Sequence, residues 1–133
     1  MLEAKILNRY RTVAIVGLSP DPSRPSHKVA SYLAQHGYEI IPVNPNAHEI
    51  LGKSSYPGLM FIPNPVEIVD IFRRPEEVMP IVDEAIKIGA KAVWMQEGII
   101  NEAAALRARD AGLLVVMDKC MFKEHRRLSK KPG

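Results

Sequence analysis

Five short apolar runs alternate with helical patterns along this chain of 133 residues. The runs are rich in Val and Ile, lack the polar alternation of a half-exposed strand, and cover residues 13–16, 39–43, 67–72, 92–95 and 113–117. Each run is therefore predicted to be a strand that is buried on both faces. Strands that alternate with helices predict a three-layer, doubly wound α/β fold, in which a five-stranded parallel sheet of order 3-2-1-4-5 has helices on both faces.

Residues that favour helix ends delimit the helices between these strands. Pro25 is suited to the first position of a helix that Gly37 ends. Pro80 would disturb a helix begun at Pro75, so the regular part of that helix is expected to start near residue 79. Asn101 is a plausible N-cap for a further helix, which is expected to close at residue 112.

The whole chain, residues 1–133, is expected to form a single domain, because its length allows one core and it contains neither a repeat nor a linker. Residues 1–10 are predicted to form a helix that covers one side. The link over residues 44–65 is rich in proline, and only a short helical turn is expected there, around Gly58. The basic C-terminal tail, residues 126–133 with His125, is predicted to be solvated and partly disordered.

Composition favours a cytoplasmic protein. Hydrophobic residues make up 47% of the chain and charged residues 25%, as in soluble globular domains. No apolar run approaches the roughly 20 residues that cross a bilayer, and the N-terminus lacks the apolar region of a signal peptide. The single cysteine, Cys120, fits a reducing compartment. Because the net charge is only +3, neither a nucleic acid nor a membrane is an expected partner.

The loop that follows the first strand, GLSPDPSR, has the features of a phosphate-binding turn. Gly17 permits a tight turn out of the strand, and Ser19 offers a hydroxyl and an amide. The amides of residues 26–28 are expected to be unpaired at the start of the Pro25 helix, where they would receive phosphate. Arg24 adds a guanidinium that can grip a phosphate in two places.

An ordinary NAD site is not predicted. The pattern G-x-G-x-x-G is incomplete after Gly17, and the second strand ends in Asn44 and Pro45 instead of an acidic residue. A neutral Asn44, with Lys53 downstream, would tolerate a ribose that carries its own phosphate. NADP and coenzyme A (CoA) both have such a ribose, and the residues alone leave both open.

In a doubly wound sheet the ligand lies beyond the carboxyl ends of the strands, where the strand order reverses. For the order 3-2-1-4-5 this crevice is expected between strands one and four. The loop after strand one, the NPN segment after strand two and the QEG segment after strand four should converge there, with the FRRP turn at the same edge.

Several motifs together resemble the small stand-alone CoA-binding proteins of bacteria and archaea. They are GLSPDPSRPS, GYEIIPVNP, LGKSSYPGL, VDIFRRPEEV, GAKAVWMQEGIINEAA and AGLLVVMDKCMFKEH, and the match covers residues 11–125. A related Rossmann-like module is found in the alpha chain of succinyl-CoA synthetase, where a Glu-Gly turn similar to that at residues 97–98 follows the fourth strand. The resemblance implies a Rossmann-like domain that binds CoA or a short acyl-CoA.

The resemblance also implies which residues contact the ligand. Those expected to hold the pyrophosphate are Gly17, Leu18, Ser19, Arg24 and Ser26. Those expected at the adenosine and its ribose phosphate are Asn44, Pro45 and Lys53. Those expected to border the groove and the pantetheine path are Phe72, Arg73, Arg74, Gln96, Glu97 and Gly98. Two alternatives stay open: the FRRP arginines could be surface charges that flank a helix, and Glu97 could be a partner of a helix terminus.

The chemistry of the ligase is not carried over with the resemblance. This chain has no room for the further ligase domains, and none of its histidines has a setting like that of the phosphorylated histidine. With no evident catalytic residues and no metal-ligand set, the favoured function is a non-catalytic binding or regulatory module. The alternative is a small enzyme that uses NADP or acts on an acyl-CoA. A further hypothesis is that Cys120 forms a mixed disulfide with CoA or is acylated, if it lies near the CoA thiol.

Overall fold

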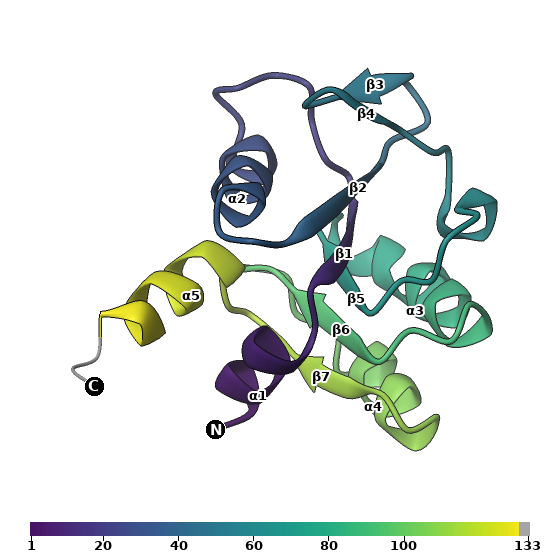
Figure 1. Cartoon of the computed structure of the whole chain (residues 1–133). Coiled ribbons are helices and arrows are strands. Elements are labelled where there is room, and N and C mark those ends of the chain that lie inside the picture. The colour runs from purple at the N-terminus through teal and green to yellow at the C-terminus, as the bar shows by residue number, and fades with distance from the viewer. Residues whose placement is uncertain (131–133) are drawn as a thin grey trace.

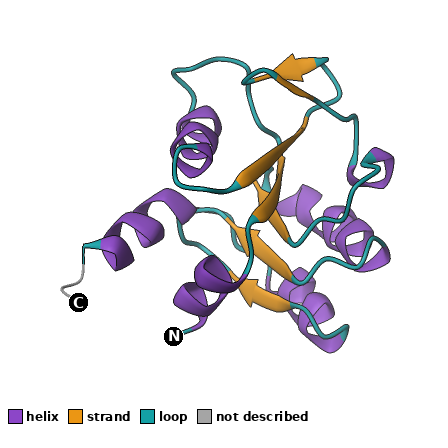
Figure 2. Ribbon diagram, viewed as in Figure 1, coloured by secondary structure: helices purple, strands orange, loops and turns teal. Residues whose placement is uncertain are grey.

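A parallel sheet of five strands lies between two layers of helices in the computed structural model, which describes residues 1–130 (Figures 1 and 2). The strands are β1 (Thr12–Val16), β2 (Glu39–Val43), β5 (Ile68–Ile71), β6 (Ala92–Met95) and β7 (Leu114–Val116). All four pairings between them are parallel. The predicted fold class and all five predicted strands are confirmed.

The sheet has the order β2-β1-β5-β6-β7. The strand predicted third, β5, therefore pairs with β1 and lies near the centre of the sheet. A single parallel bridge between Val43 and Tyr56 extends the sheet beyond β2. The segment at Tyr56 can be counted as a rudimentary third strand. The order of the Tyr56 segment, β2, β1, β5 and β6 is then 3-2-1-4-5. The predicted order therefore holds, but its third strand is the Tyr56 segment instead of β5. The apolar β5 suits a position buried on both faces, whereas the exposed polar residues just before Tyr56 suit an edge.

This arrangement moves the crevice by one strand. The strand order reverses between β1 and β5, because the chain passes from β2 back over β1 before it enters β5. The loop after β5 therefore faces the turn after β1, and the loop after β6 lies one strand further away. Figure 1 shows the carboxyl ends of β1, β2 and β5 on the side of the sheet where the hairpin and the start of α2 lie.

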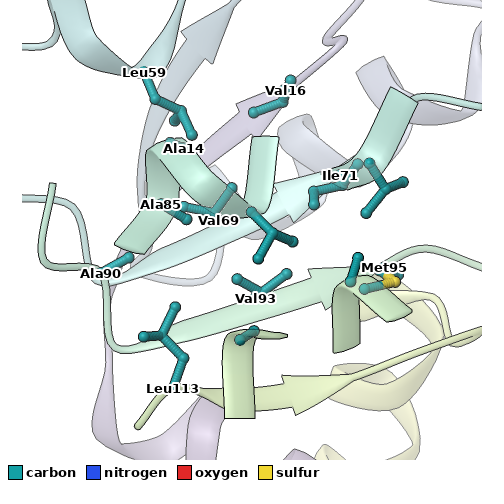
Figure 3. Packing of buried hydrophobic residues seen from close by; sticks show 14 of the residues in the cluster. Ala14, Val16, Leu59, Val69, Ile71, Ala85, Ala90, Val93, Met95 and Leu113 are labelled. Atoms are coloured by element: carbon teal, nitrogen blue, oxygen red, sulfur yellow. The ribbon is translucent and has the colours of Figure 1, made fainter. Parts of the chain in front are cut away.

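One face of the sheet is covered by α3 (Val78–Lys87) and α4 (Glu102–Asp110). Small and branched side chains fill this layer, and Figure 3 shows Ala85 of α3 next to Val69 and Val93 of the sheet. Leu59, from the short 3-10 helix η1 (Leu59–Phe61), belongs to the same cluster. The expected helical turn around Gly58 is therefore confirmed, and it is anchored in the core.

The other face is covered by α1 (Leu2–Arg9), α2 (Pro25–Ala34) and α5 (Met121–Ser129). Trp94 of β6 is fully buried in this layer, and its indole nitrogen donates to the carbonyl of Lys119 at 2.8 Å. The buried Tyr38 donates from its hydroxyl to the carbonyl of Leu7, which ties α1 to the start of β2. Helices therefore cover both faces, as predicted.

The helix ends agree with the predicted signals. Pro25 is the first residue of α2, and the Asn101 side chain caps α4 by accepting a hydrogen bond from the Ala104 amide at 3.0 Å. The regular part of α3 begins at Val78, after the 3-10 turn η2 (Pro75–Glu77). This split is consistent with the disturbance expected from Pro80.

A hairpin and a C-terminal helix were not predicted. Within the link over residues 44–65, β3 (Glu49–Ile50) and β4 (Lys53–Ser54) form an antiparallel hairpin. The prediction of a disordered tail is wrong for residues 126–129, which belong to α5; residues 131–133 lie outside the described residues. The reason is a set of aromatic contacts: Tyr32 of α2 stacks on Phe122 at 4.1 Å, and its hydroxyl lies 2.8 Å from Nδ1 of His125.

None of the described helices has the length and apolar character required to span a membrane.

Candidate ligand-binding groove

A groove runs along the carboxyl edge of the sheet, where β1, β2 and β5 end. It consists of three adjoining depressions that share some of their walls, at Gly17, Phe72, Arg73 and Glu77. The central depression has a volume of about 250 Å³ and is lined by Val16, Gly17, Val43, Pro45, Pro57, Gly58, Leu59, Arg73, Glu77, Ile81 and Glu84. A second depression, at the start of α2, is lined by Gly17, Ser19, Arg24, Pro25, Ser26 and Phe72. We call the three together the carboxyl-edge groove.

Gly17 forms the floor where the central depression meets the one at α2. Its amide donates to the Val43 carbonyl at 2.9 Å, and the Phe72 amide donates to the Val16 carbonyl at 2.8 Å, so the turn lies between β2 and β5. The φ angle of Gly17 is +90°, and a Cβ atom at this position would lie 2.4 Å from the Phe72 carbonyl oxygen. Only glycine fits here without strain. The prediction that Gly17 makes a tight turn out of the strand agrees with this geometry.

The residues after Gly17 hold the loop together. The Ser19 amide donates to Oγ of the buried Ser26 at 3.0 Å, and the Ser19 hydroxyl accepts from the Asp21 amide at 3.0 Å. Leu18 is fully buried, and its carbonyl accepts from Nδ2 of Asn44 at 2.9 Å. The sequence predicted that the Ser19 amide is offered to a ligand. In the structure this amide is bonded to Ser26 and fixes the loop onto α2.

The start of α2 differs from the expectation in the same way. The prediction that three amides are unpaired is wrong for His27 and Lys28, which both donate to the Arg24 carbonyl, at 3.1 and 3.2 Å. Arg24 is the N-cap residue, and its extended backbone turns this carbonyl toward the helix. Within residues 1–130, the amides of Leu18 and Ser26 have no hydrogen-bond partner. The exposed side chain of Arg24 lines the depression beside them.

In the loop after β2, Pro45 lines the groove, and Asn44 holds neighbouring segments together by hydrogen bonds. Pro45 lines the central depression. Asn44 joins three segments, since it donates to Leu18 and to the Tyr56 carbonyl and accepts from the Asn46 amide on its Oδ1. Lys53 lies in β4, at a separate depression on the outer edge of β2 with Ser54 and Tyr56. The structure does not bring Lys53 into the groove.

The loop after β5 brings two arginines to the groove. Phe72 lines the depression at α2, and Arg73 lines the central one. Arg73 forms an ion pair with Glu77 at 3.0 Å, and Arg74 lies 3.5 Å from the same carboxylate. Hydrogen bonds from Arg73 and Arg74 lower the pKa of Glu77 below its usual range. Both positive charges are therefore partly neutralised in the free protein.

The segment after β6 is occupied by contacts with the C-terminal part of the chain. Oε1 of the buried Gln96 accepts from the Met121 amide at 3.2 Å. Glu97 forms an ion pair with Lys123 of α5 at 2.8 Å, and the Gly98 amide donates to Asp118 at 2.7 Å. None of these three residues lines the carboxyl-edge groove.

Some groove residues were not identified from the sequence. These residues line the central depression from the segment before η1, from η1 and from α3: Pro57, Gly58, Leu59, Ile81 and Glu84. The segment that holds the first three had been read as an irregular link, so nothing marked it as a wall of the site. Glu77 is the second residue after the FRRP motif, and its spacing of four residues from Arg73 could have indicated the ion pair.

The remaining candidates for chemistry lie elsewhere. Residues 1–130 contain no cluster of three or more His, Cys, Asp or Glu side chains that could hold a metal ion. Cys120 is half-buried at the N-cap of α5 and packs against the layer of α1 and α2. Its proposed reaction with the CoA thiol stays a prediction.

Comparisons with known proteins agree with this geometry. Residues 11–126 match the family described as CoA binding domain. An uncharacterized protein of Bacillus subtilis, YneT, is 40% identical over 121 residues, which are 91% of this chain and 90% of the relative. The solved structure of a hypothetical protein from Pyrococcus horikoshii is 45% identical, with a TM-score of 0.93, and the match covers 96% of this chain and 89% of that protein.

A third relative is much longer. The ADP-forming acetate–CoA ligase II of Archaeoglobus fulgidus is 33% identical over 96 residues, and the match covers 69% of this chain but only 14% of the ligase. This similarity agrees with the resemblance to the CoA-binding module of succinyl-CoA synthetase. The family match spans almost all of the described chain, and the fold has the doubly wound sheet and glycine turn expected for such a module. The chain belongs to the CoA binding domain family.

Proposed function

We propose that this protein binds CoA or a short acyl-CoA in the carboxyl-edge groove and acts as a binding or regulatory module without catalysis of its own. The pyrophosphate would lie at the start of α2, and the adenosine in the central depression beside Pro45. The observation that carries the proposal is the turn at Gly17, where a Cβ atom would lie 2.4 Å from the Phe72 carbonyl oxygen. Glycine at this point lets the loop after β5 close against the turn, and the depression at the start of α2, where a phosphate would bind, forms beside this contact.

The charges at the α2 end of the groove support an anionic ligand. The N-terminal end of a helix carries partial positive charge, and the amides of Leu18 and Ser26 are without partners within residues 1–130. Arg24 supplies a full positive charge there and takes part in no ion pair within the same residues. A diphosphate in this depression would therefore meet the Ser26 amide and the Arg24 guanidinium, which both line it, whereas Leu18 is fully buried.

The central depression supports an uncharged ring instead. Most of its walls are apolar and come from Val16, Val43, Pro45, Leu59 and Ile81. Arg73, Glu77 and Glu84 also line it. Family membership and the similarity to an acetate–CoA ligase support CoA as the nucleotide. The neutral Asn44 at the end of β2 leaves NADP as the ligand that has to be tested against CoA.

A calorimetric comparison of ligands tests this proposal. The purified protein is titrated with CoA, dephospho-CoA, acetyl-CoA, NADP and NAD under identical salt conditions. We expect CoA and acetyl-CoA to bind with similar affinity, and both to bind at least about tenfold more tightly than NADP or NAD, which is about 1.4 kcal/mol. A preference for NADP would contradict the proposal and favour the alternative of a small NADP-dependent enzyme. If the hairpin of β3 and β4 moves so that Lys53 contacts the ribose phosphate, dephospho-CoA, which lacks this phosphate, should bind more weakly than CoA.

Replacement of Arg24 by alanine tests the position of the pyrophosphate. We expect Arg24→Ala to weaken CoA binding by about 1–3 kcal/mol, because a charge-assisted contact with phosphate is lost. The Arg24 carbonyl that caps α2 remains, so the unfolding free energy should change little. Arg109→Ala on the exposed side of α4 is the control, and it should leave the affinity unchanged. Equal affinity of Arg24→Ala and wild type would remove Arg24 from the site.

A further inference from the structure

Glu77 is an acidic residue in a groove that we propose to bind phosphates. It lines both the central depression and the one formed with Phe72, Arg73 and Arg74. Its carboxylate lies 3.0 Å from Nη2 of Arg73 and 3.5 Å from Nη2 of Arg74. It also accepts a hydrogen bond from the Arg74 amide at 3.3 Å. One carboxylate therefore contacts both arginines that the loop after β5 brings to the groove.

The arginine contacts place Glu77 in competition with a ligand. The Cδ atom of Arg73 lies 3.0 Å from the position of a Cβ atom on Gly17, so the stem of this arginine runs beside the turn. Rotation about the outer bonds of the Arg73 side chain would move its guanidinium from Glu77 toward a phosphate at Gly17. A phosphate at Gly17 would compete with Glu77 for this guanidinium, which in the free protein donates from Nη2 to the carboxylate at 3.0 Å.

We propose that Glu77 is a resident counter-ion of Arg73 and Arg74, which the phosphates of the ligand displace on binding. The inference rests on the proposed function, and it names a determinant of affinity and selectivity in the same groove. In the free protein Glu77 keeps the two arginines in a fixed place and lowers the net positive charge of the groove. A ligand with several phosphate charges gains enough from the arginines to replace the ion pairs, whereas an anion with a single charge gains less. Glu77 thus lowers the affinity for every anion and excludes the weakest ones.

The pKa of Glu77 agrees with this role. Hydrogen bonds from Arg73 and Arg74 lower the pKa of Glu77, so its carboxylate stays charged, and able to compete with phosphate, to a lower pH than an isolated Glu. The ion pairs are also accessible to solvent, since the Arg73 and Glu77 side chains are 43% and 30% exposed. Exchange of one anion for another at this position therefore needs no opening of the core.

Substitution of Glu77 by glutamine tests the inference. Glutamine has the same shape and can still accept from the Arg74 amide, but it carries no charge. The matched control is Glu76→Gln in the same turn, because Glu76 lies 3.9 Å from Arg74 and does not line the groove. The affinity of wild type and both variants is measured by calorimetry with two probes, CoA and inorganic pyrophosphate, at one ionic strength.

We expect Glu77→Gln to lower the dissociation constant of both probes by about five- to twentyfold, and Glu76→Gln to change it by less than about twofold. Unchanged or weaker binding by Glu77→Gln would overturn the inference, because Glu77 would then position the arginines instead of competing for them. An equal gain in Glu76→Gln would also overturn it, since the effect would be one of net charge.

The two probes separate this inference from the proposed function. If pyrophosphate binds and shows the expected gain but CoA does not bind to wild type, the proposed function fails and the role of Glu77 stands. If CoA binds to wild type and neither probe gains from Glu77→Gln, the proposed function stands and the role of Glu77 fails. Absence of binding for both probes would overturn both.

Discussion

Replacement of Gly17 by valine is expected to abolish CoA binding and to destabilise the fold by about 3–5 kcal/mol. The substitution places a β-branched residue at a φ angle of +90° and a Cβ atom 2.4 Å from the Phe72 carbonyl oxygen. Relief of this contact would push the turn after β1 away from the loop after β5. The proposed phosphate position lies between these segments, so stability and binding should be lost together. Denaturant unfolding and calorimetry measure the two effects.

Gly37→Val is the matched control for this experiment. Gly37 has a φ angle of +89°, but no atom lies within 4 Å of a Cβ atom built at that position. The control therefore imposes the same backbone strain, about 1–2 kcal/mol, without a collision and far from the groove. We expect Gly37→Val to bind CoA normally. If the two variants lose the same amount of stability, the contact between Gly17 and Phe72 does not have the importance that we assign to it.

The second large effect concerns Asp70, a carboxylic acid inside the core. Asp70 lies in the middle of the sheet between Ile15 and Trp94, and it is fully buried. Neither of its carboxylate oxygens has a hydrogen-bond partner among the described residues. Burial raises the pKa of Asp70 well above its usual value, and the neighbouring Ile71 amide opposes this only in part. The folded protein therefore binds a proton at Asp70 in a pH range where the unfolded chain has lost it.

Since the folded state holds the extra proton, stability should fall as the pH rises above the unfolded pKa of about 3.9. We expect Asp70→Asn, which has the same shape and does not ionise, to be more stable than wild type by about 1–3 kcal/mol at pH 8. The difference should shrink toward zero as the pH is lowered to about 4. Urea unfolding of both proteins across this range checks the expectation. A lower stability of Asp70→Asn at pH 8 would show that the carboxylate has a stabilising partner.

The sequence was a good guide to the elements that carry strong local signals. The five strands are short apolar runs, and α2 and α4 begin at Pro25 and after Asn101, whose chemistry favours a helix start. Such signals depend on neighbouring residues only, so a single sequence contains them. The glycine turn at residue 17 belongs to the same class, because its position directly after a buried strand indicated a change of direction.

Features that depend on distant parts of the chain could not be predicted in this way. α5 is stabilised by contacts of Phe122 and His125 with Tyr32 of α2, which is about ninety residues away in the chain. Its own sequence is charged and gives no sign of that contact. The position of β5 next to β1 likewise depends on where the link over residues 44–65 crosses the sheet.

The same limit applies to the groove. Gly17, Ser19 and Arg24 were predicted from the loop itself and the other site residues mainly from the resemblance. The structure brings seven of the predicted residues together at the groove walls: Gly17, Ser19, Arg24, Ser26, Pro45, Phe72 and Arg73. Lys53 and the segment from Gln96 to Gly98 lie outside these walls. The hydrogen bonds of Ser19 and Asn44 could not be inferred from spacing, because each joins loops that meet only in the folded chain.

A crystal structure of the protein in complex with CoA tests the central claim most directly. We predict that the pyrophosphate lies in the depression formed by Gly17, Ser26 and Phe72, within hydrogen-bond distance of the Ser26 amide, with the Arg24 guanidinium in contact. Density for CoA at another surface, with the start of α2 free of phosphate, would contradict the account.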